Sequence, residues 1–235
     1  MDTQMTGQCL VCGKETKNRC SSCAKAGIDL FFCSPEHQKL AWSMHRMFCG
    51  LGKANPFRWP PLSPDEVRDA IEMLDTSDQP GRLDEVSYTL AQKLLSALNV
   101  SRDDLPAFIR LLSKPSTLPL EIEAVVLRSI RLHVSVRREF AGRSSNEGQR
   151  LEPMLFLISL AFASDVYRIP SSWTTSYMHR LAVYTAVRYG DEQALQRYGQ
   201  QMIRSTFQYL DDMARDDPAN AAKAVNGLRM FLPQR

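Results

Sequence analysis

The stretch that decides the fold is residues 9–49, which read CLVCGKETKNRCSSCAKAGIDLFFCSPEHQKLAWSMHRMFC. This stretch holds all 6 cysteines of the 235-residue chain and two of its 4 histidines. They form four pairs, which are Cys9-x2-Cys12, Cys20-x2-Cys23, Cys33-x3-His37 and His45-x3-Cys49. Two residues between cysteines make a tight knuckle that directs both sulfurs at one ion, and ligands at i and i+4 share one helix face. Eight such ligands fill two tetrahedral zinc sites.

Other uses of these cysteines are less favoured. A segment of about 50 residues with few apolar side chains cannot fold on hydrophobic burial alone, so it needs disulfides or bound metal to stabilise it. Disulfides are disfavoured because the N-terminus, MDTQMTGQ, lacks the basic and apolar regions of a secretory signal, which predicts a reducing, intracellular location in nucleus or cytoplasm. A redox Cys-x-x-Cys centre is disfavoured because two such pairs follow closely without a βαβ context.

The ligand spacing, together with Gln38-x3-Trp42-x2-His45, resembles the MYND zinc finger. The resemblance covers residues 9–49, about a fifth of the chain. The chain departs from the family pattern at His37, where the family usually has cysteine, and in the loop between Cys23 and Cys33, which is a few residues longer than usual. Exchanging thiolate for imidazole changes the charge of a zinc site rather than its tetrahedral geometry, so we expect Cys33 and His37 to share an ion.

The resemblance implies a cross-braced arrangement in which the two sites interleave along the chain. One zinc ion is then held by Cys9, Cys12, Cys33 and His37, and the other by Cys20, Cys23, His45 and Cys49. The spacing alone leaves a sequential arrangement open, in which the first four cysteines bind one ion and the last four ligands bind the other.

The resemblance also implies a function. In MYND fingers that bind peptides, an extended Pro-x-Leu-x-Pro segment is added alongside a short hairpin, and the matching contact positions here are Ser21, Gln38 and Trp42. The chemistry fits, because a hairpin edge supplies main-chain hydrogen bonds and an indole face suits proline-rich ligands. The alternative for Trp42 is a core position in a very small domain.

A linker of residues 51–62 follows, rich in glycine and proline and expected to run extended. Its end, Pro60-Pro61-Leu62-Ser63-Pro64, itself satisfies Pro-x-Leu-x-Pro, so the chain could dock or self-associate through its own segment. The competing interpretation is structural: Ser63, Pro64 and Glu66 have the pattern of an N-cap, a first-turn proline and a capping box, which starts a helix near Pro64.

The rest of the chain is predicted to be helical. Apolar residues recur at three- and four-residue steps from Val67 onward. Further helices are expected at about 119–141, 151–167, 171–189, 191–215 and 218–231. We therefore predict a mainly α protein: a finger of short hairpins plus a helix at residues 1–50, and an irregular all-α bundle at 63–235. This layout resembles fungal proteins that join an N-terminal MYND finger to an uncharacterised helical region.

The amino-acid composition limits the classes of partner that we expect. The net charge of +3 is too small to demand nucleic acid, and the longest apolar stretch, residues 154–163, is about half of what a membrane span needs. The arginines at 128, 131, 137 and 138 are accompanied by glutamates and are expected to lie on a solvated helix surface. His133 and His179 are isolated, and we expect them in the core or at its boundary.

We expect an adaptor without catalytic activity, acting for example in transcriptional regulation, because no phosphate loop, nucleophile elbow, metalloprotease or dinucleotide motif occurs. One alternative is a protein-lysine methyltransferase, since MYND fingers also occur in SET-domain enzymes, but these are rich in strands and commonly carry a further cysteine cluster. Binding of S-adenosylmethionine would separate the two. An enzyme of unknown type in the helical region is a third possibility.

Overall fold

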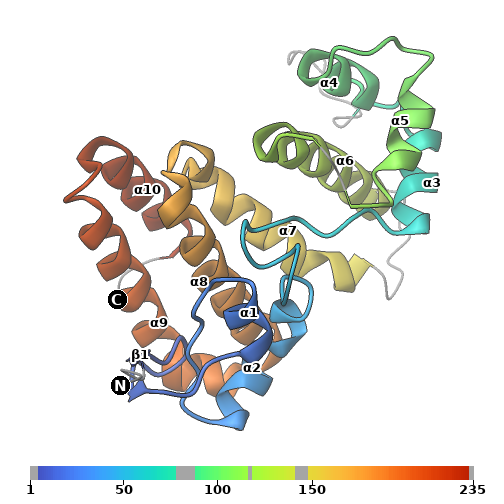
Figure 1. The fold of residues 1–235 in the computed structure, drawn as a ribbon. Coiled ribbons are helices and arrows are strands. Elements are labelled where there is room, and N and C mark those ends of the chain that lie inside the picture. Colours follow the sequence, from blue (N-terminus) through green and yellow to red (C-terminus); the bar gives the residue numbers. More distant parts are fainter. Residues whose placement is uncertain (1–4, 78–87, 116–117, 141–147, 233–235) are drawn as a thin grey trace. The chain divides into compact units, whose positions relative to one another are not determined.

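The computed structural model describes residues 5–77, 88–115, 118–140 and 148–232, and Figure 1 traces them from end to end. Contacts divide the chain into two compact units. Unit 1 consists of Met1–Arg58 and Phe156–Arg235, and unit 2 of Trp59–Leu155. The sequence-based division at residues 51–62 follows the order of the chain and stays a prediction. Packing joins the N-terminal finger to the C-terminal helices in one unit. The mainly α fold class is confirmed.

Unit 1 begins with a very small antiparallel sheet of two strands, β1 (Gly7–Gln8) and β2 (Glu15–Thr16). Their register pairs Gly7 with Thr16 and Gln8 with Glu15. The connecting turn is closed by a hydrogen bond of 2.8 Å from the Gly13 N–H to the Cys9 carbonyl. Gly13 has a φ of 74°, a left-handed conformation that glycine adopts without steric cost. The turn therefore brings the chain around between two cysteine pairs.

Two helices complete the N-terminal part of unit 1. The first, α1 (Ser21–Lys25), is a short helix that follows Cys20 and contains Cys23. The second, α2 (Pro35–His45), starts at Ser34, whose hydroxyl accepts a hydrogen bond from the His37 N–H at 3.4 Å. A serine N-cap followed by proline in the first turn is a strong helix start, because it satisfies a free N–H and needs none from the proline.

The C-terminal helices of unit 1 lie close to their predicted ranges. They are the second half of α7 (Gly148–Ala163), the 3-10 turn η1 (Val166–Arg168), α8 (Ser171–Gly190), α9 (Glu192–Met213) and α10 (Pro218–Phe231). The residues of α7 up to Leu155 belong to unit 2. The expected helix at 151–167 ends earlier, because Asp165 takes a left-handed φ of 49°. Asp217 caps α10, because its carboxylate accepts the N–H of Asn220 at the start of that helix.

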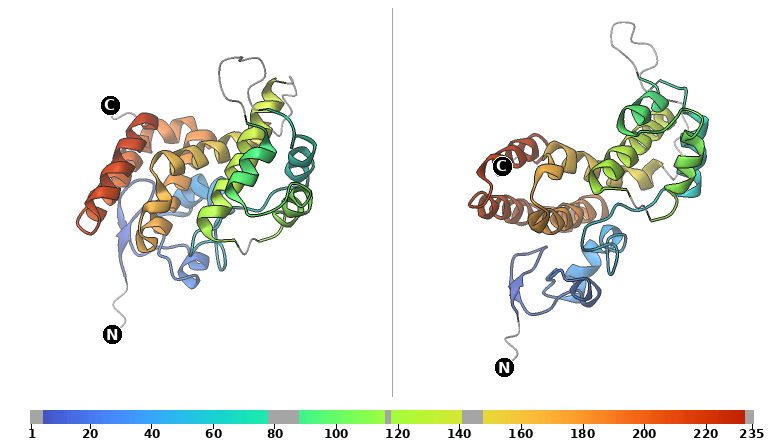
Figure 2. Two further views of the ribbon diagram at one scale, coloured as in Figure 1. Left: turned by 90° about the horizontal axis from the view of Figure 1, so that it is seen from above. Right: turned by 45° about the horizontal axis from the view of Figure 1, so that its top comes forward.

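Helix α8 lies at the centre of unit 1. Its Tyr177, Leu181 and Val187 are each at most 1% exposed. The helix packs against α2 on one side and α9 on another, and α10 packs on α9 (Figure 2). The isolated His179 is buried, as expected, and lies on the part of α8 that meets α2. The finger and α8 therefore share one core.

The segment after the finger was expected to run extended, and this prediction is wrong for residues 51–57, which form successive turns. Ala54 and Phe57 are 0% and 5% exposed. The Phe57 ring stacks on that of Phe48 with centroids 4.3 Å apart. Burial of these apolar side chains outweighs the extended tendency of a sequence rich in glycine and proline, so the chain folds back beside the finger.

Besides the first half of α7, unit 2 contains four described helices, which are α3 (Pro64–Glu72), α4 (Leu90–Ala97), α5 (Leu105–Leu111) and α6 (Leu120–Phe140). Helix α6 packs against α3 and α4, and α3 also packs against α5. The capping box predicted at Ser63 and Glu66 is present, and a second one joins Thr89 to Gln92. Leu90, Leu105 and Ile130, each 0% exposed, lie in the core of this unit.

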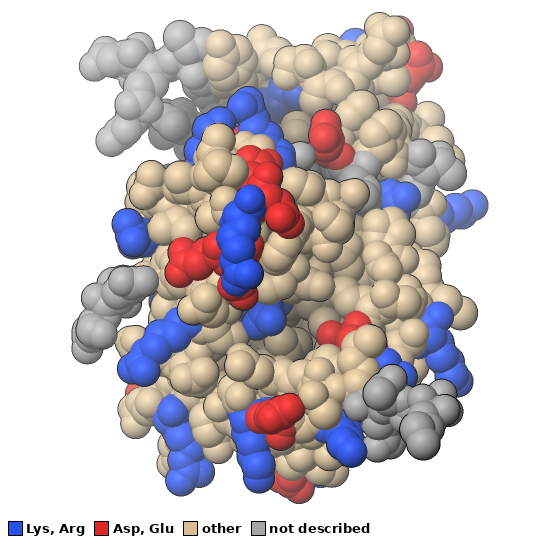
Figure 3. All heavy atoms as spheres, turned by 60° about the vertical axis from the view of Figure 1, so that its left-hand side comes forward, with Lys and Arg blue, Asp and Glu red and all other residues tan. Residues whose placement is uncertain are grey.

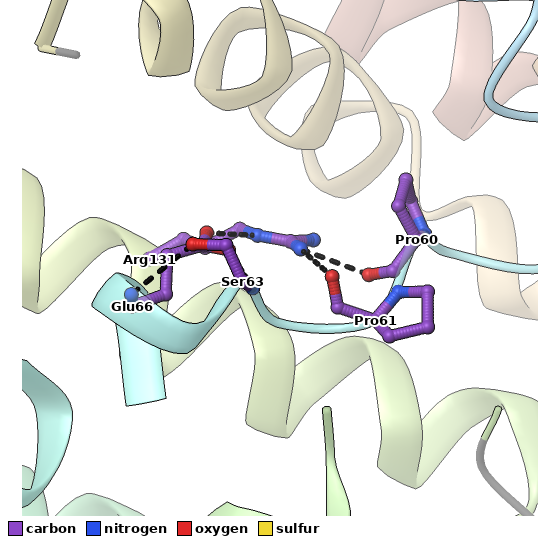
Figure 4. Close-up of polar contacts among 5 residues, drawn as sticks. All are labelled: Pro60, Pro61, Ser63, Glu66 and Arg131. Carbon is purple, nitrogen blue, oxygen red and sulfur yellow. Dashed lines mark hydrogen bonds and ion pairs between the residues drawn. The ribbon is translucent and has the colours of Figure 1, made fainter. Parts of the chain in front are cut away.

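A buried ion pair links α3 to α6 (Figure 4). Arg131 Nε lies 2.8 Å from Glu66 Oε1, and the two side chains are only 3% and 7% exposed. Arg131 Nη2 also donates to the carbonyls of Pro60 and Pro61, at 2.8 and 3.1 Å. The expectation that Arg131 lies on a solvated basic face is therefore wrong. Its guanidinium fixes the start of α3, because Glu66 also accepts the Ser63 N–H at 2.7 Å.

Candidate metal centres

The first cluster of ligands joins the N-terminal hairpin to the start of α2. Cys9 and Cys12 come from the hairpin turn, Cys33 precedes α2, and His37 lies in its first turn. His37 Nδ1 lies 3.4 Å from Cys9 Sγ and 3.1 Å from Cys33 Sγ, and the sulfurs of Cys12 and Cys33 are 3.6 Å apart. Sulfurs bound tetrahedrally to Zn²⁺, with bonds of about 2.3 Å, lie about 3.8 Å apart. The four donors therefore have the spacing of a zinc site.

The second cluster joins α1 to the end of α2. Cys20 and Cys23 flank the first turn of α1, His45 is the last residue of α2, and Cys49 follows it. His45 Nε2 lies 3.4 Å from Cys20 Sγ and 3.6 Å from Cys23 Sγ, and Cys49 Sγ lies 3.6 and 3.7 Å from the same two sulfurs. This cluster is more buried than the first, with three of its four residues in the core.

The two clusters alternate along the sequence. Within each cluster all four ligand atoms lie within 4.8 Å of one another. The first and third ligand pairs meet in one cluster, and the second and fourth pairs meet in the other. This is the interleaved arrangement, and it excludes the sequential one that the spacing had left open. Cross-bracing of this kind ties hairpin, α1 and both ends of α2 together.

Local hydrogen bonds favour the charged form of one thiol in each cluster. Burial alone would raise the pKa of Cys9, but the backbone N–H groups of Cys12, Cys33 and Val11 together lower it. The pKa of Cys20 is lowered to about 3, chiefly because the Cys23 thiol donates a hydrogen bond to it and also because His45 lies beside it. The same hydrogen bond raises the pKa of Cys23, and burial raises the pKa values of Cys33 and Cys49. Thiolate is the form that ligates zinc, so these three thiols release their protons when metal binds.

Comparison with known proteins agrees with this geometry. A family model described as "MYND finger" matches residues 9–49. Residues 9–49 are a MYND finger. No curated protein and no solved structure shows significant similarity to the chain, so the resemblance to fungal proteins with a helical region stays a prediction. The two Cys3His sites are those expected to bind the two zinc ions of this finger.

The helical part of unit 1 contacts both metal clusters of the MYND finger. The His45 ring lies 6.1 Å from that of His179 on α8, and the His37 ring meets Tyr198 on α9 edge-on at 4.9 Å. His179 is 1% exposed, and its burial lowers its pKa to about 4, so this imidazole is neutral near pH 7. Sequence reasoning missed these contacts, since neither residue lies in any ligand pattern.

The predicted peptide-binding residues of the MYND finger lie on its surface. Trp42 is 46% exposed, which excludes the core position considered as its alternative. Gln38 is half-buried and lies one turn before Trp42 on α2, so both side chains are on one face of that helix. Ser21 is exposed at the start of α1, between two ligands of the second cluster. The buried residues Ala41 and Met44 lie on a different side of α2. His45, three residues after Trp42, lies beside the indole, with ring centroids 5.9 Å apart.

The Pro-x-Leu-x-Pro segment after the MYND finger is part of unit 2. Leu62 is 3% exposed, and its N–H donates to the Leu112 carbonyl at 2.9 Å. Ser63 caps α3, and Arg131 holds the carbonyls of Pro60 and Pro61. The structure therefore favours the helix-start interpretation, and self-docking would require this segment to leave its place.

The surface charge and the apolar content of the helices bear on other classes of partner. On the face drawn in Figure 3, acidic and basic side chains alternate among uncharged residues, and neither sign forms a continuous patch among the residues described there. The surface seen there does not have the single-sign character that nucleic acid requires. None of the described helices combines the length and apolar composition of a membrane span.

Proposed function

We propose that this protein is a non-catalytic, zinc-dependent adaptor that captures an extended Pro-x-Leu-x-Pro segment of a partner protein. MYND fingers are in general protein–protein interaction modules, and this finger has both of its metal clusters in place. In the proposal, Trp42 is the apolar anchor, and Gln38 and Ser21 supply polar contacts beside it. The adaptor acts in the nucleus or cytoplasm, with transcriptional regulation as the process that the family resemblance suggests.

The observation that carries the proposal is the exposure of Trp42. An indole that is 46% exposed on the short helix of a metal-stabilised module contributes little to that module's core. Large aromatic side chains at the surface of interaction modules commonly serve as anchors for a partner. Helix α2 packs on α8, which holds the finger rigidly, and the Trp42 indole beside His45 stays accessible. Rigid placement lowers the entropic cost of capturing a flexible peptide.

The test uses zinc-loaded full-length protein and a fluorescent peptide with the core Pro-Pro-Leu-Ser-Pro in a Gly/Ser context. Trp42→Ala should weaken binding about 30-fold, the loss expected for an anchor worth about 2 kcal/mol. Phe231→Ala, an aromatic truncation at an exposed site on α10, is the matched control and should bind like the parent. Zinc content should be the same in all three proteins. Unchanged binding by the Trp42 variant would refute the assigned surface.

A further inference from the structure

A pocket of about 740 Å³ lies within unit 1, between the first turns of α2 and α9. Its volume is within the range of about 300–1,000 Å³ that is typical of ligand sites. The lining residues that matter here are Glu36, Lys39, Leu40, Asp191, Arg197 and Tyr198. The finger contributes the first three of these and α9 with its cap contributes the rest. The pocket therefore exists only where the finger packs beside this helix.

Both acidic side chains of the pocket lie at the starts of helices. Asp191 is the N-cap of α9, and its carboxylate accepts the Ala194 N–H at 2.8 Å. Glu36 lies in the first turn of α2, three residues before Lys39. Negative charge at a helix N-terminus is offset by the unpaired N–H groups there. Among the described residues, neither carboxylate forms an ion pair with Lys39 or Arg197.

The two basic side chains of the pocket have no such partners. Lys39 and Arg197 are exposed, and neither forms an ion pair with a carboxylate in the part of the chain that the structure describes. The Arg197 guanidinium lies over the Tyr198 ring, 5.9 Å from its centroid, and so adjoins the apolar surface of the pocket. Two unpaired cations at the edge of one pocket favour a ligand that carries carboxylates.

The interior of the pocket is partly apolar. Leu40 and Tyr198 are half-buried, and Ala194 is 7% exposed. The Tyr198 ring is held edge-on against His37, which is itself a ligand of the first metal cluster. A rigid aromatic wall beside free cations suits an aliphatic side chain next to an acidic one.

From these observations we infer that the pocket binds an acidic and aliphatic flank of the same partner segment that the MYND finger captures. This inference rests on the proposed function. Lys39 lies on α2 three residues before Trp42, which places it about 5 Å nearer the start of the helix, where the pocket lies. A segment anchored at Trp42 that runs toward the start of α2 therefore meets Lys39 first. The partner is therefore a protein whose proline-containing core has Asp or Glu beside Leu or Val in its flank.

The experiment compares three fluorescent peptides on zinc-loaded full-length protein. One has the Pro-Pro-Leu-Ser-Pro core with Gly/Ser flanks, and the other two carry Asp-Leu-Glu on the N-terminal or the C-terminal side. At low ionic strength, the better of the two acidic peptides should bind about fivefold tighter than the neutral one, a gain typical of two exposed charge pairs. The gain should shrink when salt is added. Equal affinities for all three peptides would overturn the inference.

Charge-reversal variants test whether Lys39 and Arg197 cause the gain in affinity for acidic peptides. In the double variant Lys39→Glu and Arg197→Glu, the ratio of the acidic to the neutral affinity should fall to about one or below. Lys223→Glu, an exposed lysine on α10, makes a control change of net charge and should keep the ratio. A ratio that survives the double variant, or that falls equally in the control, would overturn the pocket assignment.

The two proposals fail in different ways. If the neutral peptide binds and Trp42→Ala weakens its binding as predicted, while acidic flanks add nothing, the adaptor function stands and the pocket assignment fails. If no peptide with the proline core binds, both fail together.

Discussion

The Nε2 atom of His179 on α8 donates a hydrogen bond of 2.9 Å to the carbonyl oxygen of Ala54, five residues after the last zinc ligand. Both residues are at most 1% exposed. The same imidazole lies against Phe57 and against His45 of the second metal cluster, with ring centroids 5.3 and 6.1 Å away. The finger is therefore packed into the core of unit 1, and metal binding and helix stability should be linked.

Removal of zinc should loosen α8. The zinc ligands fix both ends of α2, and α2 packs along α8. Loss of the metal should therefore free α2 and expose the side of α8 that it covers. Structural zinc sites contribute on the order of 10 kcal/mol to the folding of small modules. After chelation, hydrogen–deuterium exchange should therefore rise by at least about tenfold in α8 as well as in α2.

Unit 2 provides the internal control for that experiment. Helices α3 and α6 have their own core and their own buried ion pair. Their amide exchange should change little when zinc is removed. Unchanged protection of α8 in the chelated protein would show that the finger is only an appendage of the helices.

The interleaved ligation predicts the zinc content of paired cysteine variants. Cys12 and Cys33 belong to the first cluster and Cys20 and Cys49 to the second, and each pair of sulfurs is 3.6 Å apart. The double variant Cys12→Ser and Cys33→Ser should therefore lose one zinc ion and keep the other, as should the double variant at Cys20 and Cys49. Under sequential ligation each double variant would damage both sites, and neither ion would be held normally.

Close packing of α10 on α7 makes one glycine indispensable. A Cβ atom added at Gly227 would lie 1.6 Å from the carbonyl oxygen of Ala163. A Cβ atom is fixed to the helix backbone, and the carbonyl oxygen that it would meet is itself backbone, so neither can move away alone. Gly227→Ala should therefore force the helices apart and lower the free energy of unfolding by about 3 kcal/mol. Gly190→Ala is the matched control, since nothing lies within 4 Å of its Cβ position. Urea denaturation should find the control at least as stable as the parent, whereas equal stability of both variants would contradict this packing.

The ion pair between Glu66 and Arg131 should be costly to break from one side. Glu66→Gln keeps an acceptor for the capping box but leaves Arg131 as a buried, unpaired charge, a situation that typically costs about 3–5 kcal/mol. The double variant Glu66→Gln and Arg131→Met should recover much of this loss. Glu72→Gln, at an exposed site of the same helix, should change stability by less than about 0.5 kcal/mol. Additive losses in the double variant would show that the two side chains do not act as a pair.

Features set by local chemistry could be predicted from the sequence. The ligands in each pair are three or four residues apart, so their spacing alone brings them to one ion. The start of α3 followed from Ser63, Pro64 and Glu66, which act on that one turn.

Features that depend on tertiary contacts could not be predicted. Nothing near His179 or Tyr198 in the sequence indicates that their rings would meet zinc ligands more than 130 residues earlier. Arg131 was assigned to the surface from charge pattern, but its partner Glu66 is 65 residues away. Residues 51–57 were expected to be extended, but they fold into turns that bury Phe57. The packing partners of Phe57 cannot be read from the sequence.

The central claim is that two metal ions, each held by three cysteines and one histidine, organise the N-terminal part of unit 1. Native mass spectrometry of the full-length protein tests it most directly by counting bound metal. The account predicts two zinc ions per chain, both removed by a strong chelator. A protein that folds with one zinc ion or none would contradict it.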